Sequence, residues 1–277
     1  MRLLVTGGSG YLGATILKRA PTAWNIAATY LAHPIAQKNV AAFCVDVQDA
    51  DAVNRLCDEF RPQVVIHTAA VMSGDSLSSV NVDGSRHIAR AAQHAHARLI
   101  HLSTDVVFDG ARAPYAENDL PHPLHAYGDS KARAEQGVAQ EHAHPVIVRT
   151  SLIYGFDPLD SRTQQTLNGE LPRLFSDEYR CPIFVDDLAD ALIELAQNDF
   201  VGLMNIAGLQ RLSRYEFGVK LARAFGGEPR FASAMSASFP APRPRDCTLD
   251  ISLAQKILRT RLRSIDDIIA TVHLSNR

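Results

Sequence analysis

The sequence predicts an α/β fold, built as a doubly wound parallel sheet with a smaller, irregular α/β lobe. Short β-branched runs alternate with longer helical stretches through the first half of the chain, a pattern typical of a parallel sheet with right-handed crossovers. Runs such as VVIH and RLIHLS are apolar on both faces, as strands covered by helices on both sides must be. A chain of 277 residues is also long enough to bury a full core.

The elements of the first half follow from this alternation. Buried strands are predicted at Leu3–Thr6, Ile26–Tyr30, Ala42–Val45, Val64–Thr68, Leu99–Leu102 and Val146–Arg149. Helices are predicted between them at Tyr11–Arg19, Ala50–Phe60, Ser79–His94 and about His125–Glu141. Asp49 precedes the second helix, where a carboxylate can accept a hydrogen bond from a first-turn N–H group. We therefore expect Asp49 to cap that helix.

The second half of the chain is expected to divide between two lobes. Polar and turn-forming residues dominate Gly155–Arg180, and proline is frequent in Ser236–Arg245. Between these segments the sequence predicts a helix at Val185–Gln197, with an acidic pair near its positive end, and a strand at Gly202–Ala207. We therefore expect a first domain of residues 1–150, completed by about 183–207, and a second lobe of 151–182 and 208–277.

Composition and charge argue against several classes of function. The formal net charge is -2, which gives no electrostatic basis for binding nucleic acid or an anionic membrane. The four cysteines form no Cys-x-x-Cys pair, so neither a zinc knuckle nor a disulfide framework is indicated. Glycines interrupt the apolar amino terminus early, and no later run approaches the roughly 20 apolar residues that span a bilayer. We expect a soluble protein of the reducing cytoplasm.

The eleven histidines do not form a convincing set of metal ligands. None falls into a firm His-x-x-x-His arrangement with a carboxylate ligand, so metal catalysis is not expected. We expect these histidines to be distributed over the surface.

A glycine-rich turn stands directly after the first predicted strand and reads TGGSGYLG. Gly7 permits a tight turn, Gly10 lets backbone N–H groups approach a pyrophosphate, and Gly13 lets the following helix pack closely on the sheet. Tyr11 and Leu12 open that helix and are also expected to contact the cofactor. Alone, such a triplet could be a flexible turn, but the strand before it and the helix after it favour a dinucleotide. The first domain is therefore expected to be an NAD(P)-binding Rossmann domain.

The end of the second predicted strand bears on the choice of nicotinamide cofactor. An acidic residue there would accept hydrogen bonds from the ribose of NAD, whereas a nearby cation favours the phosphate of NADP. The sequence after Tyr30 has neither, but His33 and Lys38 lie close enough to admit a 2′-phosphate. This favours NADP(H) and leaves NAD(H) open, because both side chains could equally be solvated loop residues.

Two further strand ends are expected to contact the cofactor. Asp46 and Val47, at the end of the third strand, are placed to face the adenine. Ala69 and Ala70, after the fourth strand, are small enough to let the cofactor lie against the chain.

The segment YGDSK places Tyr127 and Lys131 four residues apart, so both project from one face of a helix. An ammonium group and an oxidised nicotinamide ring both stabilise a phenolate, which brings the pKa of a tyrosine from about 10 toward the useful range. An isolated pair of this kind is more often an ordinary helix surface. Here, however, a predicted strand ends upstream in Ser103, Thr104 and Asp105, at the sheet edge where ligands bind.

Taken together, these segments resemble the extended short-chain dehydrogenase/reductases, and in particular the dTDP-4-dehydrorhamnose reductase group of sugar nucleotide-binding proteins. The resemblance rests on TGGSGYLG, VVIHTAA, Val80-Asn81, STDVVFDG, YGDSK, VRTSLIYG and RPRDCTLD, in the expected order over nearly the whole chain. STD-x-VFDG is characteristic of that group, whereas the glycine loop and Tyr-x-x-x-Lys are shared by the superfamily.

The resemblance implies an NAD(P)H-dependent oxidoreductase that reduces a keto group on a nucleotide sugar, with hydride from the nicotinamide. Tyr127 would be the general acid, Lys131 its electrostatic partner, and Thr104 the hydroxyl beside the reacting carbonyl. Asn81 would be mainly structural. Homodimers are common in this superfamily, so a homodimer is a possible assembly.

The resemblance also implies residues that bind the substrate, some at the sheet edge and some in the second lobe. Arg243 and Arg245 could hold a substrate diphosphate, because a guanidinium fork suits that geometry, or they could be solvated loop charges. Ser103, Thr104 and Asp105 would form the substrate side of the sheet edge. Leu152 stands where the group usually has a tryptophan lining the sugar pocket, and the segment after Ala70 is shorter than usual. Both departures put the identity of the sugar in doubt.

Other activities remain open at this point. Nucleotide-sugar dehydratases carry an Asp-Glu pair after the threonine, whereas here Asp105 is followed by Val106, which favours reduction over dehydration. Epimerisation needs no such pair. A regulatory NADP-binding subunit, resembling the methionine adenosyltransferase beta subunit, could keep the same loop and the same tyrosine and lysine.

Overall fold

The computed structural model describes residues 1–275 and divides into two compact units. The first unit consists of Met1–Thr104, Ala126–Arg149 and Ala189–Met204. The second consists of Asp105–His125, Thr150–Leu188 and the chain from Asn205 onward.

Seven strands form one sheet in the order β11-β6-β5-β4-β1-β2-β3. Their bounds are β1 (Arg2–Thr6), β2 (Asn25–Tyr30), β3 (Val40–Cys44), β4 (Val64–His67), β5 (Arg98–Thr104), β6 (Val146–Thr150) and β11 (Gly202–Ile206). The pairings of β1 with β2 and β4, of β2 with β3, and of β4 with β5 are parallel. This order confirms the predicted doubly wound sheet. It reverses direction between β1 and β4, where open α/β sheets bind ligands beyond their carboxyl ends.

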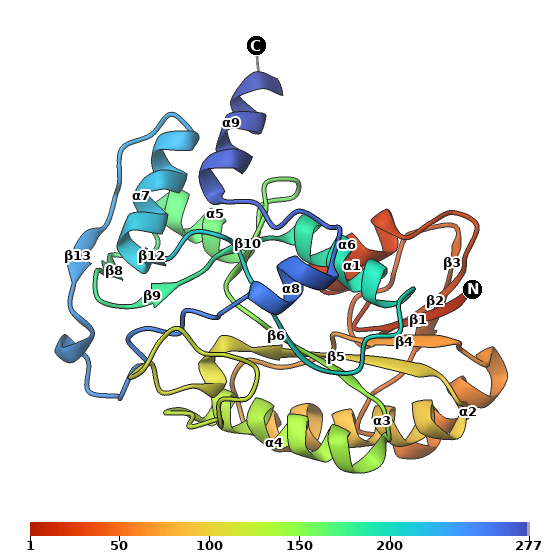
Figure 1. Ribbon diagram of the computed structural model, residues 1–277. Coiled ribbons are helices and arrows are strands. Elements are labelled where there is room, and N and C mark those ends of the chain that lie inside the picture. The colour runs from red at the N-terminus through yellow and green to blue at the C-terminus, as the bar shows by residue number, and fades with distance from the viewer. Residues whose placement is uncertain (276–277) are drawn as a thin grey trace. The chain divides into compact units, whose positions relative to one another are not determined.

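Helices cover both faces of this sheet (Figure 1). On one face lie α2 (Ala50–Phe60), α3 (Ser85–His94) and α4 (Ala126–Glu141), and on the other lie α1 (Tyr11–Arg19) and α6 (Val185–Leu195). An ion pair between Arg19 and Asp190 joins α1 to α6. Because both faces are covered, Leu3, Leu4 and Val5 of β1 are all fully buried.

Local sequence explains where the helices of this unit begin. The Asp49 carboxylate accepts a hydrogen bond of 2.9 Å from the Ala52 N–H group, which confirms the predicted cap of α2. The helix predicted at Ser79–His94 instead starts with a π-helical segment, η1 (Leu77–Gly84), and becomes α-helical at Ser85. In this segment the Ser85 hydroxyl donates to the carbonyl of Asn81. Sequence periodicity does not register such a local change of pitch.

The second unit contains more regular structure than its sequence predicted. Its helices are α5 (Ser161–Asn168), α7 (Arg214–Ala224), α8 (Ser252–Ile257) and α9 (Ile265–Ser275), with short 3-10 turns at Asp105–Val107 and Ser236–Ser238. Its strands are β7 (Ile153–Tyr154), β8 (Arg173–Phe175), β9 (Tyr179–Arg180), β10 (Ile183–Phe184), β12 (Leu212–Ser213) and β13 (Ala232–Ala234). They pair as β10 with β7, β12 with β9 and β13 with β8. An aromatic cluster around the fully buried Tyr154 forms a core of this unit.

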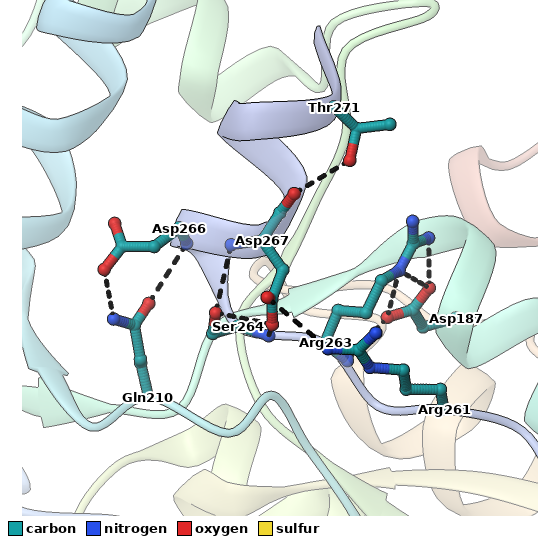
Figure 2. A network of polar contacts seen from close by, with 8 residues as sticks. All are labelled: Asp187, Gln210, Arg261, Arg263, Ser264, Asp266, Asp267 and Thr271. Atoms are coloured by element: carbon teal, nitrogen blue, oxygen red, sulfur yellow. Dashed lines mark hydrogen bonds and ion pairs between the residues drawn. The ribbon is translucent and has the colours of Figure 1, made fainter. Parts of the chain in front are cut away.

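Figure 2 shows how the amino end of α9 is fixed within the second unit. The Asp187 carboxylate accepts hydrogen bonds from both the backbone and the guanidinium group of Arg263. Ser264 and Asp267 then cap the helix, because each side chain accepts a hydrogen bond from the backbone N–H group of the other. Within residues 1–275, no helix combines the length and the apolar character that crossing a membrane requires.

Candidate active site

The glycine loop lies between the carboxyl end of β1 and the start of α1. Gly7 has a φ of +72°, which side chains rarely adopt, and a Cβ atom there would lie 2.8 Å from the Ala69 nitrogen. At Gly13 a Cβ atom would lie 2.2 Å from the Gly7 carbonyl oxygen. These two glycines therefore allow the loop to pack against the end of β4 and the helix to pack against the loop.

Gly10 has a different environment from Gly7 and Gly13. It is exposed, and among the described residues a Cβ atom there would meet only the Gly7 carbonyl oxygen, at 3.1 Å. As in any helix, the first-turn N–H groups of α1 have no acceptor within the helix. The absence of a side chain at Gly10 leaves the space in front of these N–H groups open. Such an arrangement fits the pyrophosphate of a dinucleotide.

The ends of β2 and β3 supply the other predicted cofactor residues. Tyr30 is half-buried at the end of β2, while His33 and Lys38 are exposed in the following loop. The Asp46 carboxylate accepts a hydrogen bond of 2.9 Å from the Gln48 N–H group. Val47 is buried in the core cluster of the first unit, so contact between its side chain and the adenine remains a prediction.

The segment after β4 is held by Asn81. Its side chain accepts a hydrogen bond from the Val71 N–H group and donates to the Val71 carbonyl, so it acts like a strand partner for that residue. It also donates to the Ser130 hydroxyl at 2.9 Å, which joins η1 to α4. Asn81 thus has the structural contacts that the resemblance implied. Ala70 is exposed and Ala69 is half-buried beside the glycine loop.

Tyr127 and Lys131 lie one turn apart near the start of α4, in the same unit as the glycine loop. Tyr127 is half-buried, whereas Lys131 is 3% exposed. Thr104 is half-buried at the carboxyl end of β5, against which α4 packs. Burial lowers the pKa of Lys131 to about 8, and the nearby charge of Glu135 opposes that shift. Burial therefore makes the charged form of this amine less favourable than that of an exposed lysine.

Ser103, the residue before Thr104, donates a hydrogen bond to one member of a buried ion pair. Its hydroxyl donates to the Glu135 carboxylate at 2.5 Å. Arg149 donates to the same carboxylate from β6, and both charged side chains are almost completely buried. Contact between Ser103 and a substrate remains a prediction, but its hydroxyl already has a structural role. Glu135 and Arg149 were not singled out from the sequence, because a pairing across two elements leaves no local pattern.

The expected surface distribution of the histidines is wrong for three of them. His67 and His101 are 1% and 0% exposed in the centre of the sheet, and His142 is 6% exposed. His67 and His101 are direct partners in the register of β4 and β5. They lie within apolar strands, so burial of the strands carries them into the interior. Among the described residues, no group of histidine, cysteine and acidic side chains could hold a metal ion.

The remaining predicted site residues lie in the second unit. Asp105 is buried, accepts a hydrogen bond from Ser151 at 2.6 Å and lies 3.6 Å from the Arg180 guanidinium. Leu152 packs against the aromatic cluster of this unit. Arg243 forms an ion pair with the buried Glu178, and its guanidinium lies 4.7 Å from the centre of the Phe175 ring.

Three further arginines, Arg162, Arg180 and Arg214, gather near Arg243, and the sequence did not single them out. Burial and the nearby charges of Arg162, Arg180 and Arg243 together lower the pKa of Arg214 to about 9, while Glu178 opposes the shift. Crowded cations of this kind are stabilised by an anion. Arg162 and Arg214 belong to α5 and α7, and nothing in the sequence showed that these two helices would bring them together.

Comparisons with known proteins show the family of this chain. The family model described as RmlD substrate binding domain matches residues 1–273. The chain is 29% identical to a dTDP-4-dehydrorhamnose reductase of Aggregatibacter actinomycetemcomitans, over 92% of both chains. It is 28% identical to methionine adenosyltransferase 2 subunit beta of Xenopus laevis, over 92% of this chain and 82% of that protein.

Solved structures show the same architecture. A dTDP-4-dehydrorhamnose reductase of Bacillus anthracis, solved in complex with NADP, has a TM-score of 0.85 and 23% identity, and the match covers 99% of both chains. At that identity the likeness concerns the fold. The family match covers nearly all of the sequence and includes both units. The chain belongs to the RmlD substrate binding domain family.

Proposed function

We propose that this protein is an NAD(P)H-dependent reductase of a keto group on a nucleotide sugar, similar to the dTDP-4-dehydrorhamnose reductases. The observation that carries the proposal is Lys131. It is a buried amine on α4, one turn after the half-buried Tyr127 and against the strand that ends in Thr104. Among the described residues Lys131 forms no ion pair with a carboxylate; its hydrogen-bond contact is to a neutral imidazole, that of His101. A buried lysine of this kind, in a unit that also holds the glycine loop, fits a catalytic role better than a structural one.

The protein's own residues account for binding of the cofactor and for the proton. The open face at Gly10 and the first-turn N–H groups of α1 would hold the pyrophosphate, and Lys131 the nicotinamide ribose. A bound reduced nicotinamide would supply the hydride. Tyr127 would donate its phenolic proton to the substrate oxygen, which the Thr104 hydroxyl positions. The Lys131 ammonium stabilises the resulting phenolate until the solvent returns a proton to it.

For the cofactor we propose NADP(H) in preference to NAD(H). No carboxylate follows Tyr30 at the end of β2, and His33 and Lys38 are both exposed in the loop that follows. Either side chain can approach a 2′-phosphate without losing an internal partner that the structure shows. Dissociation constants measured for NADPH and NADH on wild-type protein and on His33→Asp test this. We expect the substitution to weaken the binding of NADPH and to leave the binding of NADH unchanged.

For the substrate we propose a diphosphate group bound by the arginines of the second unit. Arg243 is oriented by Glu178 and lies over an aromatic ring, which limits the motion of its side chain. The cations that depress the pKa of Arg214 would be neutralised by a diphosphate. Leu152 occupies the position where the related reductases carry a larger ring, so the sugar itself is left to experiment.

A regulatory subunit is the alternative, because the similarity to methionine adenosyltransferase 2 subunit beta spans as much of this chain as the similarity to the reductases. The two functions are separated by turnover. The purified protein is incubated with NADPH and a panel of 4-keto nucleotide sugars, and loss of the reduced-nicotinamide absorbance is followed. We expect turnover with at least one sugar and its loss in Tyr127→Phe. Absence of turnover, together with altered kinetics of a methionine adenosyltransferase on addition of the protein, would favour the subunit.

A further inference from the structure

The two buried histidines beside Lys131 differ in their hydrogen bonding. His67 is satisfied at both ring nitrogens, with Nδ1 at 2.6 Å from the Thr6 hydroxyl and Nε2 at 3.0 Å from the Ser85 hydroxyl. Ser85 donates its own proton to the Asn81 carbonyl, so its oxygen must accept from His67. This fixes the proton of His67 on Nε2 and makes Nδ1 the acceptor from Thr6. His67 is therefore a neutral residue with a structural role.

His101 has a functional neighbour instead. Its Nε2 lies 3.5 Å from Nζ of Lys131, and both side chains are almost completely buried. An ammonium group can only donate, so Nε2 must present its lone pair and the ring proton must sit on Nδ1. Among the described residues, Nδ1 has no hydrogen-bond partner. The one polar contact of this imidazole that the structure shows is therefore the one to the lysine.

Among the described residues, His101 is the hydrogen-bond acceptor that the structure shows for Lys131. Glu135 lies one turn further along α4, but its carboxylate is already engaged by Arg149 and Ser103. Tyr127 lies one turn before, on the same helix. From the sheet, His67 and His101 face the lysine, and the positive charge of the lysine lowers the pKa of both rings. Two cations this close in a dry interior are unfavourable, so the histidines stay neutral while the lysine is charged.

We propose that His101 is a positioning residue for the reaction, whose Nε2 accepts a hydrogen bond from Lys131 and holds the ammonium in its charged form and in place, one turn after Tyr127 on α4. This rests on the proposed reductase function. Without this acceptor, Lys131 would remain buried but would lose the hydrogen bond that offsets the cost of burying its charge. The amine would then lose its proton at a lower pH and would support the phenolate less well.

Substitutions at His101 can separate its two ring nitrogens. In His101→Gln the amide oxygen can reach the position of Nε2, whereas in His101→Asn the amide reaches only the position of Nδ1. His101→Leu removes both. Loss of a hydrogen bond to a charged group corresponds to a fall of about 1 to 2 pH units in the pKa of Lys131. We expect this fall in the Leu and Asn variants and substantial rescue in the Gln variant.

The direct measurement is an NMR titration of the full-length protein labelled with 13C at the lysine side chains. The Lys131 signal is assigned from its loss in Lys131→Arg; the other lysines are Lys18, Lys38, Lys220 and Lys256. His142→Gln is the matched control, because His142 is also buried in this unit but its Nε2 contacts the Ala97 carbonyl instead. We expect that control to leave the pKa of Lys131 unchanged.

A kinetic arm follows the alkaline limb of kcat/KM against pH, which should move down with the pKa of Lys131 in the Asn variant and return in the Gln variant. If Leu is not tolerated, the comparison of Asn with Gln decides the matter, since both are polar and fit the site. Equal lysine pKa values in the Asn, Gln and wild-type proteins would overturn the role of His101. Because the titration needs no turnover, that result is distinct from a failure of the reductase function, which would show as absence of activity with normal titration.

Discussion

Gly10 and Gly13 occupy the same loop, yet the structure predicts that a methyl group at each will do different damage. Gly10 has a φ of -73° and a ψ of 164°, which alanine adopts readily. Its added Cβ atom would meet only the Gly7 oxygen at 3.1 Å among the described residues. Replacing an N-cap glycine by alanine costs about 1 kcal/mol or less. Gly10→Ala should therefore fold with nearly wild-type stability.

At Gly13 the added Cβ atom would lie 2.2 Å from a backbone oxygen and 2.9 Å from two further backbone atoms. Backbone cannot rotate aside as a side chain can, so the cost is at the upper end of overpacking, about 3 kcal/mol. A gain of up to about 1 kcal/mol from helix propensity offsets part of it. We expect Gly13→Ala to lose about 2 kcal/mol in free energy of unfolding.

For cofactor affinity, Gly10→Ala is the more informative of the two variants. If the pyrophosphate lies on the open face of Gly10, the methyl group overlaps it at a cost of about 1 to 3 kcal/mol, or about 5- to 150-fold in affinity. Urea unfolding gives the stabilities, and calorimetric titration with NADPH gives the affinities. A Gly10→Ala protein of normal stability that binds NADPH as tightly as wild type would refute the placement of the dinucleotide on this loop.

Three further outcomes are expected. Tyr127→Phe should lower kcat by about 10²- to 10⁴-fold with little change in NADPH affinity, because only the proton donor is lost; steady-state kinetics and titration check both, and retained kcat would exclude Tyr127 as the acid. Lys131→Ala should reduce both kcat and NADPH affinity; a change in neither would remove the lysine from the site. Burial lowers the pKa of His67 from 6.5 to about 3, so between these values the unfolded chain binds a proton that the folded chain does not. The free energy of unfolding should fall as the pH drops through this window, by up to about 1.4 kcal/mol per pH unit. Urea unfolding at a series of pH values should show a smaller loss per pH unit for His67→Gln than for the wild type.

The first unit was predictable because its signals are local. Both α1 and α2 begin and end where apolar periodicity and the Asp49 cap place them. The strands were predicted to within a residue or two, because apolar runs on both faces mark buried parallel strands. The resemblance to the reductase group, carried by motifs along nearly the whole chain, agreed with the family match.

The second unit was less predictable, because its elements are short. Its strands have two or three residues, too few to show alternation. One signal was overlooked: Ser213 and Glu216 form a capping box at the start of α7, and the Ser-x-x-Glu spacing is readable in the sequence. The arginines that gather around Arg214 come from separate elements and could not be found from spacing.

In the candidate site, the residues could be proposed from the sequence, but their contacts could not. Tyr127, Lys131 and Thr104 were identifiable from spacing and position. The contact of Lys131 with His101 was not, since His101 lies on β5 and reaches Lys131 through tertiary packing. Packing also buries the Ser103 hydroxyl, which donates a hydrogen bond to the Glu135 carboxylate, although its place at the sheet edge indicated a ligand contact.

Isotope transfer separates hydride reduction of a nucleotide sugar, assisted by Tyr127, from every reaction in which the cofactor keeps its hydrogen. NADPH carrying deuterium at both positions of the reactive ring carbon is incubated with the enzyme and the keto sugar that the panel identifies, and the product is examined by mass spectrometry and NMR. The mechanism predicts deuterium on the former carbonyl carbon, formed far more slowly by Tyr127→Phe. Product formed without deuterium, or at an undiminished rate by the phenylalanine variant, would contradict it.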